Sequence, residues 1–376
     1  MPRAPLMMAC VGDLSGQVRG KGFPVAQRTQ RIARGVGWTP TNVQITCFDT
    51  IAPSPYGSFG DVVLWPDPAS EVRVVLPGRA TAEHLILGDL TELDGTPWSC
   101  CLRSLLRRML VRLAERTGLQ LKATFEHEFT LKGDVAAGPA FSVTGFRAAQ
   151  PLGEILLGAL DQAGIVADSF LREYGGRQYE ITLEPTDALR AADQALLLRE
   201  LTRAVAALHD RSVTFSPLVD PGGVGNGVHI HMSLWDDAGR PVTRDPAGRH
   251  GLSSAAGAFV AGILAHMPAL VALTAPSVIS YTRLTPHRWS AAFNNLAVQD
   301  REAGIRVCPT SARDEEGRAR QFNVEYRAAD AAANPHLALA ALVAAGLQGI
   351  EEALPTPAAG SVTICPSRVG SAGGTS

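Results

Sequence analysis

Four segments of this chain alternate apolar and polar residues in the pattern of β-strands that have one buried face. Successive side chains of an extended strand point to opposite sides, so every second residue shares a surface. In ATFEHEFTL (residues 123–131) the mainly apolar positions fall on one face, whereas Glu126 and Glu128 fall together on the other. This segment therefore predicts a strand with an apolar back and two neighbouring carboxylates on its front.

The same arrangement recurs in RQYEITLE (177–184), NGVHIHMSLW (226–235) and QFNVEYRA (321–328). Their fronts carry acids, histidines, a hydroxyl and an arginine, and two interpretations remain open. The fronts lie in water, as one side of an antiparallel sheet commonly does, or they line a cavity for cations and an anionic ligand, because charges are not buried without partners. Glutamates with one or two histidines suit Mg²⁺ or Mn²⁺. His127 and Trp235 we interpret as packing residues.

Helical spacing of apolar residues predicts four long helices. They cover residues 101–118, 188–209, 252–273 and 334–353. Before the first helix, short β-rich runs separated by Gly and Pro predict a small, mainly β domain, and after it strands and helices alternate. We expect an N-terminal domain of residues 1–95, a second domain of residues 96–355, and a disordered tail of small and polar residues, 356–376.

Composition narrows the class of protein. The chain has 376 residues, of which 46% are hydrophobic and 19% charged, as in soluble globular proteins with a large core. The net charge of −2 gives no support to nucleic acid or an anionic membrane as the main partner. Six scattered cysteines without a CxxC pair indicate reduced thiols. Since no apolar run reaches the roughly 18 residues of a membrane span, we expect a cytoplasmic location.

Six segments resemble, in order and at compatible spacing, the signature segments of the glutamine synthetase family. They are FEHEFTL, REYGGRQYEI, GNGVHIHMSLW, SYTRL, DREAGIR and VEYRAADAAANPHLALAALVAAGLQGIEE. Upstream, GDLSGQVRGKGFP and CFDTIAPSPYGSFGDVVLWPD resemble the family's N-terminal domain, so that the resemblance spans about residues 10–353. It implies an α+β protein with an N-terminal β-grasp domain and a catalytic domain built on a curved antiparallel sheet backed by helices. It also implies a homo-oligomeric ring, in which each N-terminal domain completes a neighbour's active site.

The resemblance also implies roles for individual residues, with ATP and two or three Mg²⁺ or Mn²⁺ ions as cofactors. One ion would be bound by Glu128, Glu173 and Glu180, and another, nearer the ATP phosphates, by Glu126, His229 and Glu325. The other implied contacts are those of Arg301, Arg306 and Arg320 with nucleotide phosphates, of His231 and Ser233 with ATP, of Gly225, Arg283 and Arg327 with glutamate, and of Asp49 with ammonium. Among these, Asp49, Arg283, Arg301 and Arg327 would act in catalysis.

The implied reaction is amide ligation in two steps. ATP phosphorylates the γ-carboxylate of glutamate, and an amine or ammonia then displaces phosphate from the acyl phosphate. Cations and arginines are needed because the carboxylate and the triphosphate repel each other. Water must be excluded because it would hydrolyse the acyl phosphate.

Three residues depart from the family pattern. Ammonia-using members carry a glutamate on a flap after the arginine of SYTRL, where it helps to remove a proton from the attacking nitrogen. Here Trp289 occupies that position, and no carboxylate occurs between Asp245 and Asp300. An indole is no base, but it can form an apolar wall for an organic amine, and our hypothesis is therefore a γ-glutamyl–amine ligase. Val224 and Asn323 replace an asparagine and an arginine that are usual in the family.

Two alternatives stay open at this point. One is an ordinary glutamine synthetase that uses ammonia, which the missing flap glutamate disfavours. The other is a catalytically silent homologue that binds nucleotide or glutamate and acts as a regulator, which Val224 and Asn323 favour modestly. Retention of all six metal-ligand positions favours an enzyme.

Overall fold

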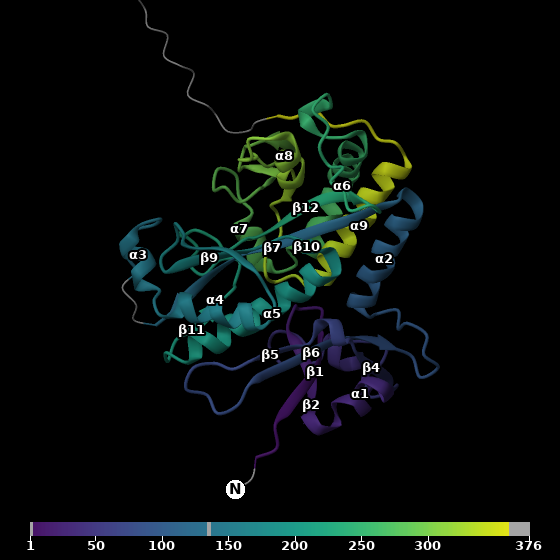
Figure 1. Cartoon of the computed structure of the whole chain (residues 1–376), viewed down its shortest axis with the longest axis vertical. Helices are drawn as coiled ribbons and strands as arrows, with labels where there is room; N and C mark the ends of the chain where they lie inside the picture. The colour runs from purple at the N-terminus through teal and green to yellow at the C-terminus, as the bar shows by residue number, and fades with distance from the viewer. Residues whose placement is uncertain (1–2, 134–136, 361–376) are drawn as a thin grey trace, which may run out of the picture.

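The computed structural model describes residues 3–133 and 137–360, and Figure 1 shows two sheets in it, one for each expected domain. Within these residues the N-terminal sheet has six strands, of which five follow the order β2-β1-β6-β4-β3. The sixth, β5, pairs with residues 83–85 of β6, whereas β4 pairs with residues 88–91. β1 runs parallel to β6 and the other pairs are antiparallel. The elements are β1 (Leu6–Gly12), β2 (Val18–Pro24), α1 (Arg28–Arg34), β3 (Val36–Trp38), β4 (Val62–Pro66), β5 (Val72–Val74) and β6 (Glu83–Thr91). A small, mainly β domain is confirmed.

The four strands expected from alternation lie side by side at the centre of the second sheet, in the order β15-β12-β7-β9. Among the described residues this sheet has nine strands. Its pairs are antiparallel except at one edge, where β13 runs parallel to β14. The strands are β7 (Leu119–Lys132), β8 (Ala167–Arg172), β9 (Gln178–Leu183), β10 (Thr186–Asp187), β11 (Ser212–Thr214), β12 (Val228–Asp236), β13 (Phe293–Val298), β14 (Ala303–Val307) and β15 (Val324–Tyr326).

The four expected helices are confirmed as α2 (Leu102–Thr117), α5 (Ala188–Ala207), α6 (Ser254–Thr274) and α9 (Pro335–Glu351). Local chemistry explains two of their ends. Asn334 caps α9 by accepting a hydrogen bond from the Leu337 backbone, and Gly118 ends α2 in the left-handed conformation that glycine adopts without strain. Shorter helices, α3 (Val143–Ala148), α4 (Leu152–Gln162), α7 (Val278–Arg283) and α8 (Glu315–Gln321), occupy the connections.

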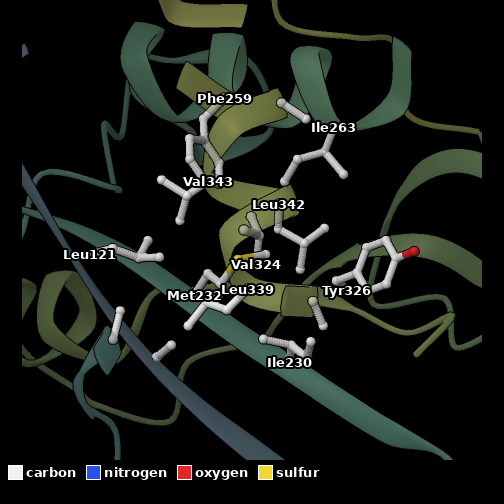
Figure 2. Packing of buried hydrophobic residues seen from close by; sticks show 14 of the residues in the cluster. Leu121, Ile230, Met232, Phe259, Ile263, Val324, Tyr326, Leu339, Leu342 and Val343 are labelled. Atoms are coloured by element: carbon white, nitrogen blue, oxygen red, sulfur yellow. The ribbon is translucent and has the colours of Figure 1, made fainter. Parts of the chain in front are cut away.

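The apolar backs of β15, β12 and the first half of β7 form a core with α6 and α9, whereas those of β9 and the rest of β7 pack with α4 and α5. Figure 2 shows Ile230 and Met232 of β12 packed with Leu339 and Leu342 of α9, and all four side chains are buried. The two helices approach closely at Gly262, where a Cβ would lie 2.1 Å from the Ala345 carbonyl oxygen. Because the backs bury this core, the polar fronts of the same strands must face the opposite side of the sheet.

By length and composition α6 could cross a membrane, with a mean hydropathy of 1.9. It packs along α9 in the catalytic core, however, and half of its apolar window is buried. A core helix of a soluble protein has the same composition, so α6 gives little support to a membrane location.

The start of the expected disordered tail is ordered. Ala359 forms a β-bridge with Leu296, and Gly360 donates a backbone hydrogen bond to the Leu296 carbonyl. Residues 361–376 of that tail lie outside the described residues. At the other division, Trp98 and Cys101 still pack in the N-terminal core, beyond the expected limit at residue 95. The division into 1–95 and 96–355 stays a prediction.

A buried ionic network joins the N-terminal domain to the second domain. The guanidinium of Arg103 on α2, whose side chain is 5% exposed, lies 3.0 Å from Asp89 on β6 and 2.8 Å from Asp67 in the N-terminal domain. Arg103 also pairs with Asp193 on α5, at 2.9 Å. Asp193 in turn pairs with His336 of α9, at 2.8 Å. One arginine thus ties the N-terminal sheet to two helices of the catalytic domain.

Removing this arginine should weaken the junction between the domains. Arg103→Ala leaves Asp193 buried without its cation, and we expect a loss of about 3–5 kcal/mol in the free energy of unfolding. Arg107→Ala is the matched control, because Arg107 contacts the same Asp67 and Asp89 with a side chain that is 46% exposed. Its loss should stay below about 1 kcal/mol. Urea unfolding measures both, and equal losses would contradict the assignment.

Candidate active site

A cavity of about 880 Å³ opens on the polar front of the central sheet. Most of the residues that the sequence predicts for a site line it. They are Glu126, Glu128, Glu173, Glu180, Gly225, His229, Arg283, Trp289, Arg301 and Arg327. Both acids and arginines line this cavity, so it is suited to cations together with an anionic ligand. This favours the interpretation that the fronts line a cavity over the one in which they simply face water.

Strand register brings the acids and histidines together. His229 on β12 pairs with Glu126 on β7, and on the other side of β7 Glu128 pairs with Glu180 on β9. His231 likewise pairs with Glu325 on β15. Facing side chains on adjacent antiparallel strands lie about 5 Å apart at Cβ. A front of acids and histidines therefore becomes a cluster as soon as these strands pair.

Two groups of donor atoms lie close enough to hold a metal ion, with all atoms of a group within 4.8 Å of one another. One consists of Glu126, Glu180 and His229, and the other of Glu126, His231 and Glu325. These sets differ from the two that the family resemblance implies, because Glu126 belongs to both and His231 joins the second. The assignment of particular donors to particular ions stays a prediction.

Charge crowding perturbs this cluster. Burial, and then the neighbouring Glu126, Glu128 and Glu173, raise the pKa of Glu180 to about 10. Burial and Glu128 also raise the pKa of Glu173. Glu126 has the opposite shift: burial opposes it, but the neighbouring His229 and His231 hold its pKa well below the usual value. The carboxyl groups of the cluster thus outnumber its two histidines.

The donor set fits divalent metal ions. It offers carboxylate oxygens and imidazole nitrogens, as Mg²⁺ and Mn²⁺ require. His231 Nε2 is buried without a hydrogen-bond partner in the described residues, and it lies 3.5 Å from Glu126 Oε2. An imidazole nitrogen and a carboxylate oxygen at this separation can share one ion. Glu126 Oε1 is 2.5 Å from His229 Nδ1, which places a second imidazole beside the same carboxylate.

The surroundings of Glu128 hold it in place. Glu128 Oε2 accepts hydrogen bonds from the Gly227 backbone at 2.7 Å and from Gln178 Nε2 at 3.1 Å. Gln178 is 1% exposed and also donates to the Gly225 carbonyl at 2.8 Å. The sequence analysis missed Gln178 as a site residue, although it shares the front of β9 with Glu180. It links the acid cluster to the glycine segment expected to contact glutamate.

Arg283 is the buried cation beside that segment. It is 4% exposed, and its Nη2 donates to the carbonyls of Ala328 and Ala329 at 2.7 and 3.0 Å. Asp330 Oδ2 lies 3.5 Å from its Nε. A Cβ at Gly225 would lie 2.5 Å from Arg283 Cγ, so only glycine lets the backbone pass here. These contacts fix the guanidinium of Arg283, and Arg283 is one of the residues that line the cavity.

Glu325 joins the metal cluster to two arginines. Its Oε2 accepts from Arg306 Nη1 at 2.7 Å, and its Oε1 accepts from Arg327 Nη1. Burial would raise its pKa, but His231, Arg327 and His229 together hold the pKa of Glu325 at about 2. Arg306 and Arg327 thus bind the two oxygens of this carboxylate.

The remaining predicted residues lie away from the cavity lining. Ser233 accepts a hydrogen bond from Trp235 Nε1 at 2.8 Å further along β12. Arg320 on α8 is exposed and pairs with Glu316 at 3.1 Å. Asp49 has a side chain 91% exposed in the N-terminal domain, 3.6 Å from Arg19. The structure does not bring these three into the cavity, and their roles stay predictions. His127 and Trp235 are buried, as their interpretation as packing residues requires.

Comparisons with known proteins decide the family. A model of the glutamine synthetase catalytic domain matches residues 99–365, and one of the glutamine synthetase N-terminal domain matches residues 3–98. The chain belongs to the glutamine synthetase family. It is therefore a carbon–nitrogen ligase of a family that uses ATP and divalent metal ions, and the alternative of a silent regulator is not favoured. The expected fold class is confirmed with it.

Relatives of this family member include a gamma-glutamylpolyamine synthetase as well as glutamine synthetases. Gamma-glutamylpolyamine synthetase GlnA3 of Streptomyces coelicolor is 36% identical, over 92% of this chain and 75% of that protein. Type-1 glutamine synthetase 1 of Dictyostelium discoideum is 30% identical, over 95% and 76%. A crystal structure of a novel glutamine synthase homolog superimposes with a TM-score of 0.90 at 44% identity, over 95% and 85% of the two chains. The complex of GmaS with ADP gives a TM-score of 0.81 at 26% identity, over 95% and 81%.

Trp289, the residue expected in place of a flap glutamate, lies in the wall of the cavity. Its side chain lines the cavity and makes an edge-to-face contact with Tyr174, with ring centroids 5.5 Å apart. Tyr174 contacts Phe141 in the same way at 5.0 Å. Sequence analysis missed Tyr174 and Phe141, because both lie on loops where no alternation marks a face. It also missed Glu302, which contacts the flap only through backbone groups.

Binding of a divalent ion should release a proton. The Glu180 carboxyl, with a pKa of about 10, is protonated at pH 7.5 and must ionise to bind a cation. We expect roughly one proton released per protein on Mn²⁺ binding, and an affinity that rises with pH between about 6 and 9. Calorimetry in two buffers of different ionisation enthalpy measures this release.

Two glutamate variants test the origin of that proton. Glu180→Gln should abolish the release and weaken Mn²⁺ binding. Glu184→Gln, which changes an exposed residue just beyond β9, should leave both unchanged. Undiminished proton release in Glu180→Gln would show that Glu180 is not the protonated group.

Proposed function

We propose that this ligase uses ATP to join the γ-carboxylate of glutamate to an organic amine, through an acyl-phosphate intermediate. The observation that carries the proposal is Trp289 in the cavity wall, where ammonia-using members of the family have a glutamate. Among the described residues, the acids that line the cavity are Glu126, Glu128, Glu173 and Glu180, all in the cation cluster. The name of one relative, a gamma-glutamylpolyamine synthetase, supports amide formation with an amine.

The proposed roles follow the charges in the cavity. Arg283 and the Gly225 backbone would hold the amino acid, since this arginine is buried and fixed by backbone carbonyls. Arg301 and Arg327 line the same cavity. They would neutralise the phosphates while the phosphoryl group moves from ATP to the γ-carboxylate of glutamate. Arg306, beside Glu325, would contact the nucleotide from the other side of that carboxylate.

We propose Mg²⁺ or Mn²⁺ for the acid cluster, in two or three positions. Glu126, Glu128, Glu173, Glu180, His229 and Glu325 are the proposed ligands. When bound, the ions would neutralise the triphosphate and the γ-carboxylate so that the two can approach. The protein supplies the carboxylates, and hydrogen bonds from Gln178 and the Gly227 amide hold one oxygen of Glu128 in place.

Asp49 suggests that neighbouring subunits share the site. It does not line the cavity of its own chain, and its side chain is 91% exposed. We propose a homo-oligomeric ring in which Asp49 of one subunit completes the next subunit's cavity. Light scattering of the purified protein tests this arrangement. An assembly of several subunits is expected, and a monomer that is fully active would contradict it.

The amine proposal predicts a preference that kinetics can measure. With glutamate, ATP and Mg²⁺, ADP release should proceed with at least one organic primary amine at a kcat/KM about tenfold or more above that for ammonia, because the indole offers apolar contact but no base. Mass spectrometry of the product should show the γ-glutamyl amide. A clear preference for ammonia would contradict the proposal.

A pair of substitutions isolates the flap residue. Trp289→Glu restores a carboxylate at this position and should raise the use of ammonia relative to the organic amine by about tenfold or more. In Trp289→Gln the new side chain has the size of glutamate but no negative charge. This variant should lose amine activity without gaining ammonia activity. Equal behaviour of the two variants would mean that the carboxylate is irrelevant here.

A further inference from the structure

We propose that Phe141, Tyr174 and Trp289 form the subsite for the attacking amine, and that it takes a primary amine with one positive charge and an aromatic or alkyl substituent. We propose further that Glu302 is the residue that positions Trp289 in this subsite. The inference rests on the proposed function and specifies its amine. The name aromatic vestibule is used below for the three rings.

The aromatic vestibule is built from three separate segments. Phe141 precedes α3, Tyr174 lies in the turn between β8 and β9, and Trp289 lies on the flap between α7 and β13. All three line the cavity, and the rings meet edge to face in sequence. Each residue is more than half exposed, although large aromatics are usually buried. Three rings left open at one cavity mouth offer an apolar contact surface to a ligand.

Charge at the cavity argues against a second positive group on the amine. Of the lining acids, Glu126 and Glu180 belong to the donor groups that can hold a metal ion, and Glu128 and Glu173 are further proposed ligands. Beside the aromatic vestibule stands Arg288, which also lines the cavity and whose neighbour on the flap is Trp289 itself. Because Glu173, next to Tyr174, is one of the proposed metal ligands, the charge left beside the aromatic vestibule for a distal ammonium is that of Arg288. A substituent without charge avoids this repulsion and gains the contact with the rings.

Glu302 holds the flap through its backbone. It is 3% exposed, and its two carboxylate oxygens accept hydrogen bonds from the backbone of Trp289 at 2.6 Å and of His287 at 3.2 Å. Its own backbone amide donates to Asp300 at 3.0 Å. With both oxygens engaged in this way, Glu302 acts on the amine only through Trp289 and is a positioning residue.

The flap needs such a clamp because its backbone is strained. His287, Trp289 and Ala291 have φ of 61°, 55° and 58°, in the left-handed region that non-glycine residues rarely adopt. Conformations of this kind persist only where the surroundings hold them, and they concentrate at functional sites. Two of the three strained residues donate their backbone N–H groups to the Glu302 carboxylate. Loss of that carboxylate should release the indole from the cavity wall.

Matched amines test the substrate class. Pentylamine and 1,5-diaminopentane share one carbon chain and differ by the second ammonium, and phenethylamine adds an aromatic ring. We expect kcat/KM for pentylamine and phenethylamine to exceed that for 1,5-diaminopentane by about tenfold or more. A preference for the diamine or for spermidine would overturn the inference while leaving the proposed ligase intact. Absence of ADP release with every amine and with ammonia would instead refute the proposed function.

Variants of Glu302 test its positioning role. Glu302→Ala should raise KM for phenethylamine about tenfold, the scale of a lost aromatic contact, with KM for glutamate and for ATP changed less than twofold. Glu302→Gln keeps one acceptor oxygen and should give an intermediate KM. Glu200→Gln, a glutamate on α5 that pairs with Arg203, should change none of the three constants.

Tryptophan fluorescence separates positioning from a general structural role. Phenethylamine should shift the emission of the wild type, and Trp289→Phe should abolish that shift. Glu302→Gln should reduce the shift in proportion to its rise in KM. If Glu302→Ala does not fold, Glu302→Gln decides alone. An unchanged amine KM, or equal rises in the constants for glutamate and ATP, would overturn the role of Glu302.

Discussion

Repulsion among neighbouring carboxylates is the constraint on which this active site depends. Antiparallel pairing of β7 with β9 and β12 sets Glu126, Glu128 and Glu180 beside one another and beside His229. The fold can accept this only because the strands' backs bury a large apolar core and so fix the register. Burial, and after it the neighbouring carboxylates, raise the pKa of Glu180 to about 10. Divalent cations relieve the repulsion, and for this reason the cluster is suited to a reaction that needs them.

The same cluster is connected to the amine side of the cavity. Glu325 Oε1 accepts from Arg327 Nη1, Arg327 Nε donates to the Arg301 carbonyl at 3.0 Å, and Arg327 Nη2 lies 3.4 Å from the Trp289 carbonyl oxygen. Trp289 is thus held by Arg327 at its carbonyl and by Glu302 at its amide. Positions of the acid cluster, the arginines and the indole are therefore set by one continuous set of contacts.

Sequence reasoning succeeded where a periodic pattern carried the information. Alternation placed Glu126 and Glu128 on the front of β7, and the spacing of leucines placed α2, because both periods follow from backbone geometry. Glu302 could not be found in this way, since its partners are backbone amides of a strained loop. Phe141 and Tyr174 lie on loops with no repeating pattern. The contact of His231 with Glu126 depends on three-dimensional distances that no linear spacing encodes. The parallel pairing of the edge strand β13 with β14 is likewise not encoded in a linear pattern.

The central claim is that donors from β7, β9, β12 and β15 converge to bind divalent cations. Anomalous diffraction from a crystal of the full chain soaked in Mn²⁺ tests it most directly. The account predicts manganese peaks within coordinating distance of Glu126, Glu180 and His229, with Glu128 and Glu325 contributing oxygens to the same cluster. Manganese bound elsewhere, or no ion in the cavity at a saturating concentration, would contradict it.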